Sequence, residues 1–354
     1  MTAEALPNSA DAEHLTDALR RSGVLGRGRV CNVNVEHSYP TVVSHVLRLR
    51  LTYEPDESAA PRSVIFKTGL PGRTSDLHTA GRQEVAFYGQ VAPLMSARLV
   101  PRCFDAAWDE DTKAWHLVLE DLSESHTAPT AWPLPPTMAQ CETILGALAR
   151  FNAAWWDDRR LGISIGTWID PATYAQRLQG FAAHFTAFAD RVGDRLSGER
   201  RDLYRRVLDA APRLFARYHS HRNVTLIHGD AHVWNVLMPK DEQSGDVRLF
   251  DWDTWRIGVA SSDLAYMMAM HWYPDLRRRR ERPLLDRYHA ALLAQGVGGY
   301  DRRALDDDYR LSVLLQILTP VLQAAYDIPP WIWWNNLERI LLAVDDLGCR
   351  ELLG

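Results

Sequence analysis

The chain has 354 residues, which is enough to bury a large core and favours two lobes or domains over one. Its composition is that of an ordinary globular protein, with 46% hydrophobic residues, 24% charged residues and a net charge of −5. A charge balance of this kind gives no general attraction to nucleic acid or to an anionic membrane. We expect neither as a partner, and the sequence indicates no oligomeric state.

The cysteines and the N-terminal segment point to the cellular compartment. The four cysteines are scattered and show no CxxC spacing, which argues against a disulfide framework and a zinc site. The first residues lack a basic region followed by an apolar core, so we expect no signal peptide. The most apolar long segment, 311–326, contains polar residues and is too short to span a bilayer. We therefore expect a reduced, cytoplasmic protein.

The first third of the chain is rich in predicted strands. A short helical pattern begins at Ser9 and ends before Gly23. Val- and Leu-rich runs with partial alternation follow, and they are typical of an antiparallel sheet whose first two strands are joined by a turn at 37–41. The predicted strands are 28–36, 42–53, 63–66, 102–108 and 114–122. One further helix is predicted at 81–91, between the third and fourth strands.

Helical patterns replace the strands after Leu122. The Ser-, Thr- and Pro-rich segment 123–136 is the candidate boundary, so the predicted domains are 1–122 and 123–354. Apolar residues then recur every three or four positions over long segments. The predicted helices are 138–156, 174–188, 201–219, 262–272, 283–295, 303–326 (kinked at Pro320) and 331–347. The basic run Arg277–Arg280 is predicted to be a solvated loop. The fold class is therefore α+β, a small mixed lobe followed by a mainly helical one.

Lys67 stands out in the predicted sheet. Only three of the 40 basic residues are lysines, and this one ends the apolar run Ser63–Phe66. A buried ammonium group is costly without anionic partners. Lys67 therefore either binds phosphate or extends its amine from the strand end into water. Glu84 lies early in the predicted helix 81–91, where it could orient Lys67 by an ion pair or simply be exposed.

The strand 117–122 ends at the candidate boundary. If a nucleotide binds there, the backbone of Glu120 and Leu122 is placed to bond adenine. A strand that ends in a turn explains these residues equally well.

The segment 225–258 is the one β-rich part of the predicted helical lobe, and it concentrates polar side chains. In the motif HGDAHVWN, Asp230 could orient a substrate hydroxyl and Asn235 could reach Mg²⁺. Asp251 follows the next apolar run and could bridge Mg²⁺ to nucleotide phosphates. Asp253 is a candidate metal ligand, substrate contact or turn residue. Asp263 is predicted to be a structural N-cap.

A rival interpretation of the same segment is a metal-dependent hydrolase. His228, Asp230 and His232 alternate, so on an extended strand they would face one side and could bind a transition metal. Such a site normally needs further ligands, and the sequence shows no second histidine cluster.

Aromatic residues near these motifs are candidate acceptor contacts. Core packing explains most tryptophans. Trp252 and Trp255 nevertheless flank Asp253, and Trp333 and Trp334 cannot both point the same way on a helix. We expect Trp252, Trp255 and Trp334 to be available for an apolar or cationic substrate.

The chain resembles the aminoglycoside phosphotransferase and choline kinase-like superfamily, in particular its ecdysteroid kinase-like branch. The resemblance rests on the order of Lys67, Glu84 and the motifs LVLEDL, HGDAHVWN and FDWD. The resemblance extends from about residue 28 to the C-terminus. It implies a bilobal protein-kinase-like fold, with ATP and Mg²⁺ in the cleft between the lobes. The implied reaction is transfer of phosphate to a hydroxyl of an antibiotic, aminoalcohol, sugar or other metabolite.

The resemblance also implies roles for single residues. Lys67 would bind the α- and β-phosphates with Glu84 as its partner, Asp230 would be the catalytic aspartate, and Asn235 and Asp251 would hold Mg²⁺.

The sequence departs from the family pattern in the turn between the first two strands. The turn Glu36–Thr41 has no glycine, so a glycine-rich cover for phosphate is absent. The backbone or hydroxyls of Ser38, Thr41 or Ser44 would have to replace it. This departure keeps open a second hypothesis, a nucleotide-binding pseudokinase without transfer activity. Asn152 stands where relatives often carry histidine, and its role is open.

Overall fold

The computed structural model describes residues 6–70, 78–95, 98–241 and 246–354, and the chain divides into two compact units. The first unit comprises Met1–Thr127 and Leu237–Thr254, and the second comprises Ala128–Val236 and Trp255–Gly354. The strand-rich first unit and the helical second unit confirm the predicted α+β class. The units differ from the predicted domains 1–122 and 123–354 because Leu237–Thr254 packs with the first unit.

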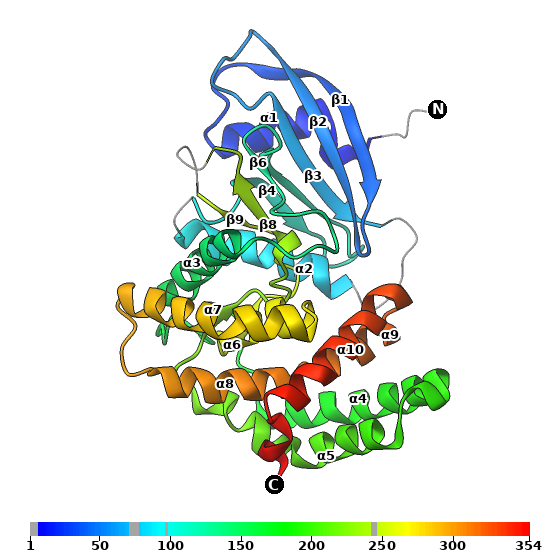
Figure 1. Cartoon of the computed structure of the whole chain (residues 1–354). Helices are drawn as coiled ribbons and strands as arrows, with labels where there is room; N and C mark the ends of the chain where they lie inside the picture. The colour runs from blue at the N-terminus through cyan, green and yellow to red at the C-terminus, as the bar shows by residue number, and fades with distance from the viewer. Residues whose placement is uncertain (1–5, 71–77, 96–97, 242–245) are drawn as a thin grey trace. The chain divides into compact units, whose positions relative to one another are not determined.

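A five-stranded antiparallel sheet forms the first unit (Figure 1). Its strands lie in the order β1-β2-β3-β5-β4. Their bounds are β1 Arg29–Pro40, β2 Ser44–Glu54, β3 Ser63–Gly69, β4 Cys103–Trp108 and β5 Trp115–Glu120. The predicted turn at 37–41 is wrong, because β1 stays paired with β2 as far as Pro40, opposite His45. The turn is confined to the three residues between the strands.

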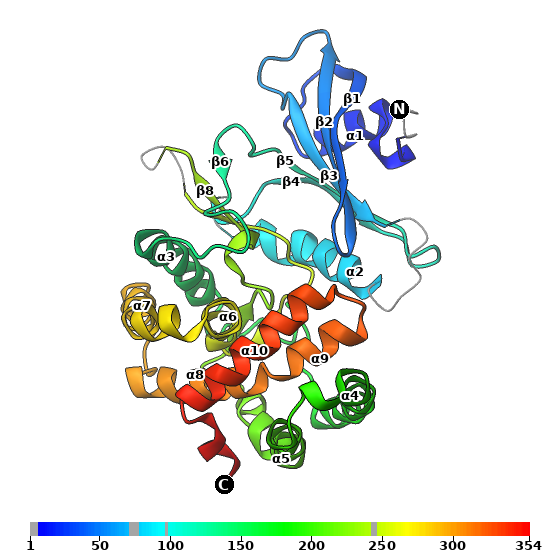
Figure 2. The ribbon, with the colours of Figure 1, turned by 45° about the vertical axis from the view of Figure 1, so that its right-hand side comes forward.

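Each face of this sheet is covered by a helix. On one face, Leu47, Leu49 and Phe66 form a core with Leu15 and Leu19 of α1 (Ala12–Arg21). The other face carries Lys67 and contacts α2 (His78–Ala86), which continues into a π-helical turn at Phe87–Val91 (Figure 2). The alternation of side chains along a strand thus places Lys67 on the α2 side of the sheet.

A shared carboxylate fastens α1 to the sheet. His14 and His116 both place Nε2 within 2.9 Å of Asp105 Oδ2, and Arg21 bonds the other carboxylate oxygen at 3.1 Å. Burial opposes ionisation of Asp105, but these hydrogen bonds outweigh it and hold the pKa of the carboxyl well below its usual range. Among the described residues, this trio is where three metal-ligating side chains of the His, Cys, Asp and Glu type converge.

A small second sheet carries Leu237–Thr254 onto the first unit. It consists of β6 (His126–Thr127), β8 (Val236–Pro239) and β9 (Arg248–Leu249), with β8 in the centre. The amides of Lys240 and Leu249 donate to the carbonyls of Ser125 and Leu99, both at 2.9 Å. These bonds fix the chain just before Asp251.

The second unit is mainly helical, as predicted. Its helices are α3 Met138–Ala154, α4 Pro171–Val192, α5 Gly198–Phe215, α6 Ser261–Ala265, α7 Pro274–Ala294, α8 Arg302–Leu315, α9 Leu318–Ala325 and α10 Pro330–Asp346. Two strands, β7 (Thr225–Ile227) and β10 (Arg256–Gly258), pair antiparallel beneath the polar loop. The helix predicted at 303–326 is two helices, and the one predicted at 262–272 is α6 followed by a π-helical turn at Tyr266–Met270.

Asn152 has a structural role in this unit. It is fully buried on α3, its side-chain amide donates to the carbonyl of Leu226 at 2.9 Å, and its oxygen accepts from the Tyr288 hydroxyl at 2.7 Å. Asn152 therefore joins α3 to β7 and α7.

The basic run Arg277–Arg280 is not a loop. It lies in α7, and Arg277 is 1% exposed. Its guanidinium donates to Glu281 at 2.9 Å and to Asp346 of α10, while Glu281 also accepts from the Tyr309 hydroxyl. The prediction was wrong because Arg277 has two carboxylate partners, the buried Glu281 on the same helix and Asp346, which is distant in sequence.

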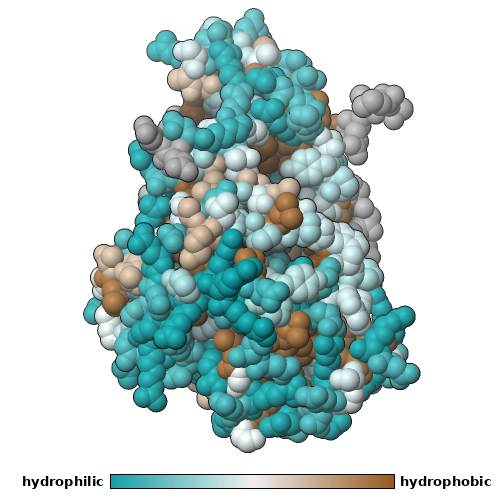
Figure 3. Space-filling view, viewed as in Figure 1, coloured by the Kyte–Doolittle hydropathy of each residue, from teal (hydrophilic) through white to brown (hydrophobic). Residues whose placement is uncertain are grey.

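The surface shows the ordinary mixture of a globular protein. The face in Figure 3 is mostly hydrophilic, with apolar groups in small patches. In the described part of the chain, we find no helix whose length and apolar character would suffice to cross a membrane.

We predict that Arg277→Ala lowers the free energy of unfolding by about 3–5 kcal/mol, because it leaves the buried carboxylate of Glu281 without its cation. Denaturant unfolding followed by circular dichroism measures the change. Arg279→Ala, at an exposed position of the same helix, is the matched control and should change stability by less than about 0.5 kcal/mol. Equal losses in the two variants would contradict the buried network.

Candidate active site

The first unit holds a buried lysine between two carboxylates. Lys67 Nζ lies 2.6 Å from Glu84 Oε2 and 2.5 Å from Asp251 Oδ1. Glu84 is 1% exposed, and the backbone amide of Trp252 also donates to it. The sheet, α2 and the segment after β9 thus each contribute one member of the group. The ion pair expected between Lys67 and Glu84 is present, and the contact of Lys67 with phosphate stays a prediction.

Electrostatics keep this lysine charged. Burial disfavours the ammonium form, but Asp251 and Glu84 outweigh it and raise the pKa of Lys67 above its usual value. Burial also disfavours the charged form of Glu84. It therefore raises the pKa of this carboxyl, although Lys67 acts in the opposite direction. Asp253 also acts on Lys67 electrostatically. One cation therefore faces three acidic side chains.

The geometry of Asp251 is imposed by its neighbour. Asp251 has a φ of 67°, which is uncommon for a residue other than glycine and marks a constrained position. Trp252 next to it has no exposed surface. Its ring stacks on Phe87 with 4.0 Å between centroids, and its Nε1 donates to the Leu249 carbonyl at 3.1 Å. Trp252 thus anchors Asp251, and its burial does not fit the predicted contact with an acceptor.

These side chains suit a hard divalent cation. Carboxylate oxygens are the ligands that Mg²⁺ prefers. The Asp251 side chain is 30% exposed, although its Oδ1 bonds Lys67, so it can still present an oxygen to a metal. The excess of carboxylates over cations in this group also favours a bound cation.

The second unit holds the HGD loop, 228–235. It follows β7, whose three residues are all buried. Gly229 has a φ of 86°, a conformation that favours glycine. The Asp263 carboxylate accepts from the amides of His228 at 2.8 Å and Gly229 at 2.9 Å, so the loop is tied to α6. The N-cap prediction for Asp263 is wrong, because its side chain bonds amides distant in sequence and lies inside α6. Burial raises the pKa of this carboxyl.

Asn235 orients Asp230 within the loop. The Asn235 amide nitrogen donates to Asp230 Oδ2 at 2.9 Å and to its carbonyl at 3.0 Å. This arrangement leaves the Asn235 side-chain oxygen as the atom suited to a metal. His232 Nε2 lies 3.5 Å from the same Asp230 oxygen. The three metal-ligating atoms required by the hydrolase hypothesis do not converge here, since among described residues that occurs at His14, Asp105 and His116.

An aromatic surface continues from Asp230 through the second unit. We use this name for the rings of His232, Trp234, Trp132 and Trp331. His232 contacts Trp234 with 5.6 Å between centroids, Trp234 lies 6.3 Å from Trp132, and Trp132 lies 4.8 Å from Trp331. Trp132 and Trp331 are 52% and 54% exposed. Neither Trp132 nor Trp234 was predicted as a site residue, although Trp234 lies inside the motif HGDAHVWN itself.

A partly buried histidine borders this surface. His271 lies 5.6 Å from both His232 and Trp234 between centroids, and its Nδ1 is 2.8 Å from the Tyr266 carbonyl. Burial, together with His232, lowers the pKa of His271 to about 3, so its ring is neutral at physiological pH.

The remaining predicted tryptophans differ in exposure. Trp255 lies just before β10 and is 2% exposed, which does not fit the predicted acceptor contact. Trp334 lines a groove of about 610 Å³ together with Trp331, Trp333, Arg191 and Arg195.

The other residues that were predicted to contact the nucleotide already form hydrogen bonds within the protein. The Glu120 amide donates to the Arg102 carbonyl at 2.8 Å, and the Leu122 carbonyl accepts from the amides of Ser125 and His126. Their contact with adenine stays a prediction. Ser38 pairs with Leu47 on the core side of the sheet, away from Lys67, and its hydroxyl lies 2.9 Å from His45 Nε2. The Thr41 hydroxyl bonds Ser44 within the turn. Their contact with phosphate also stays a prediction.

Comparison with known proteins identifies the family. The sequence profile of the ecdysteroid kinase-like family matches residues 41–156 and 171–296. The chain belongs to the ecdysteroid kinase-like family. No curated protein matches it significantly.

Solved structures of small-molecule kinases share the fold of this family member. A choline kinase from Cryptosporidium parvum superposes with a TM-score of 0.57 at 10% identity, covering 96% of this chain and 98% of the other. A candidate aminoglycoside phosphotransferase from Ralstonia eutropha gives 0.59 at 14% identity, covering 96% and 97%. A choline kinase from Streptococcus pneumoniae gives 0.54 at 11% identity, covering 95% and 99%. At these identities the likeness establishes the protein-kinase-like fold and no acceptor.

We predict that Asp263→Ala destabilises this ecdysteroid kinase-like protein by about 2–5 kcal/mol, because the buried amide of His228 and the partly buried amide of Gly229 lose their acceptor. Asp263→Asn keeps one acceptor oxygen and should cost about half as much. Denaturant unfolding measures both changes.

The matched control is Asp301→Ala. Asp301 also accepts a backbone amide, that of Ala304 at 2.8 Å, but at the exposed start of α8. Its loss should cost about 1 kcal/mol. If Asp263→Ala were no more harmful than this control, Asp263 would not hold the loop.

Proposed function

We propose that this protein is an ATP- and Mg²⁺-dependent kinase that phosphorylates a hydroxyl of a small molecule. The observation that carries the proposal is the buried Lys67 with Glu84 and Asp251, in a chain that also carries Asp230 and Asn235 on the HGD loop. Phosphoryl transfer depends mainly on positioning and charge neutralisation, and these residues supply both. Membership of the ecdysteroid kinase-like family supports it.

The proposed residue roles follow the chemistry of transfer. The acceptor hydroxyl oxygen forms a bond to the γ-phosphorus of ATP, while the bond between that phosphorus and the β–γ bridging oxygen breaks and ADP leaves. Asp230 orients the hydroxyl and accepts its proton. Lys67 would bind phosphate oxygens, and Asn235 and Asp251 would provide ligands for Mg²⁺, which would neutralise charge on the phosphates.

A pseudokinase that binds nucleotide without transfer is the second candidate, because the β1–β2 turn has no glycine. ATP consumption in the presence of a panel of hydroxylated metabolites and antibiotics separates the two. Turnover with any member of the panel supports the kinase, whereas ATP binding without turnover across the panel supports the pseudokinase.

We predict that Asp230→Ala lowers the rate of transfer by at least about 100-fold, because the acceptor hydroxyl loses its base. Binding of ATP with Mg²⁺, measured by titration calorimetry, should stay within about twofold of the original protein. Loss of ATP binding in this variant would contradict the role given to Asp230.

The contrasting variants are Asp251→Ala and the milder Asp251→Asn. Both should weaken nucleotide binding only when Mg²⁺ is present, because the metal loses a carboxylate ligand. Unchanged binding would rule out Asp251 as the metal ligand.

For the acceptor, we propose a hydroxylated molecule with a large apolar ring surface and no cluster of positive charges. The aromatic surface leads from Asp230 to Trp331, and Trp331 also lines the groove with Arg191 and Arg195. Among the described residues neither arginine forms an ion pair, so the groove disfavours a polycation. Its volume of about 610 Å³ falls in the range of ligand pockets.

We predict that a pooled library gives phosphorylated products from ring-bearing neutral or acidic alcohols, detected by mass spectrometry, and little product from polyamines. Trp331→Ala should raise KM for such an acceptor several-fold through lost ring contact while the KM for ATP is unchanged. Trp168→Ala, a tryptophan stacked on His221 instead, is the control. Preferred phosphorylation of aminoglycosides or choline would refute this acceptor class.

A further inference from the structure

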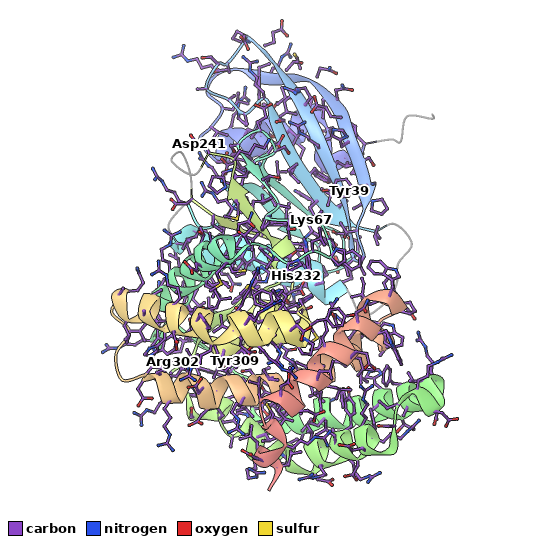
Figure 4. The ribbon with its side chains drawn as sticks, viewed as in Figure 1. Tyr39, Lys67, His232, Asp241, Arg302 and Tyr309 are labelled. Atoms are coloured by element: carbon purple, nitrogen blue, oxygen red, sulfur yellow. The ribbon has the colours of Figure 1, made fainter. Side chains whose placement is uncertain are left out.

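The β1–β2 hairpin directs Tyr39 to the side of the sheet that holds Lys67. Tyr39 pairs with Val46, and Val46 pairs with Lys67 on the next strand. Residues paired across antiparallel strands point to the same face, so all three side chains share one face. Two strand spacings separate the Tyr39 and Lys67 backbones by about 10 Å. Two long side chains can therefore meet over Val46, and Figure 4 shows both residues in this part of the sheet.

The other hydroxyl groups of the hairpin are engaged within it. The Thr41 hydroxyl accepts from the Ser44 amide at 3.0 Å and lies 2.9 Å from the Ser44 hydroxyl. Ser38 bonds His45 on the opposite face. The hairpin contains no glycine that would let backbone amides approach a phosphate closely. Tyr39 is left as the hydroxyl donor of this hairpin on the Lys67 face.

The Tyr39 side chain is placed for a ligand. Tyr39 is 52% exposed, and among the described residues its hydroxyl has no hydrogen-bond partner. Partial burial raises the pKa of the phenol, with effects of opposite sign from Lys67 and Asp251. The hydroxyl therefore keeps its proton at neutral pH. It also lies close enough to Lys67 and Asp251 to interact with both charges. Pro40 follows and limits the freedom of the backbone at this point.

We propose that the Tyr39 hydroxyl donates a hydrogen bond to a phosphate oxygen of the bound nucleotide, in place of the backbone amides of a glycine-rich loop. The inference rests on the proposed nucleotide-binding function. It assigns to one side chain the task that relatives of the protein-kinase type give to a flexible loop. A single phenol contacts one phosphate, so the contribution should depend on how many phosphates the ligand carries.

The test compares Tyr39→Phe with the original protein by titration calorimetry, with ATP, ADP and adenosine as ligands and Mg²⁺ present. Removing a donor to a charged oxygen should weaken ATP about tenfold. Adenosine affinity should not change, because the ring is kept and adenosine has no phosphate. The ADP affinity of the variant identifies the phosphate that Tyr39 contacts. If ADP binding is weakened as much as ATP binding, the contact is with the α- or β-phosphate, and if ADP binding is unchanged, it is with the γ-phosphate. A loss of structure alone would weaken adenosine as well.

The matched control is Tyr326→Phe, at a tyrosine that is 37% exposed at the end of α9. It should leave affinity for all three ligands unchanged. Unchanged ATP affinity in Tyr39→Phe overturns this inference but leaves the kinase proposal standing. Equal weakening of ATP and adenosine also overturns it, since Tyr39 would then contact the base. If the original protein binds none of the ligands, the proposed function fails and this inference fails with it.

Discussion

The buried ammonium group of Lys67 is the constraint on which the candidate active site of the first unit depends. Removing such a charge from water costs several kcal/mol unless carboxylates surround it. Glu84 and Asp251 lie within 2.6 Å of it, and they come from α2 and from the segment after β9. The need to compensate one charge therefore fixes the position of α2 against the sheet. It also holds Leu237–Thr254, distant in sequence, on the first unit.

The same constraint leaves an excess of negative charge. Lys67 balances one of its two carboxylate partners, and Asp253 adds a further acidic group nearby. Such an arrangement is unfavourable by itself and becomes favourable once a divalent cation binds. The rigid support of Asp251 by the stacked Trp252 means that little reorganisation is needed on binding. Fixed geometry of this kind is what electrostatic stabilisation of a phosphoryl group requires.

Sequence patterns predicted the parts of this protein that depend on local periodicity. The strand carrying Lys67, the helix carrying Glu84 and the helical second unit all have regular apolar spacing. Contacts between distant segments were not predictable in this way. The partner Asp346 of Arg277 lies in another helix, so the basic run was assigned to solvent. Asp263 has the sequence context of an N-cap, yet its carboxylate bonds the HGD loop. Nothing local distinguishes Trp252, a buried anchor, from Trp331, which is exposed.

Rigid support extends to the HGD loop of the second unit. Asp263 holds the amides at its start, Gly229 makes the bend and Asn235 fixes the Asp230 carboxylate. Because the Asn235 amide nitrogen is committed to Asp230, its oxygen is the atom directed to other ligands. The loop is thus organised before any ligand binds. Next to it, the neutral His271 and the aromatic surface offer ring contacts and no carboxylate cluster. If the proposed function is correct, selection of the acceptor would depend on shape and apolar contact, because the described residues of this surface offer few charges to attract a polycation.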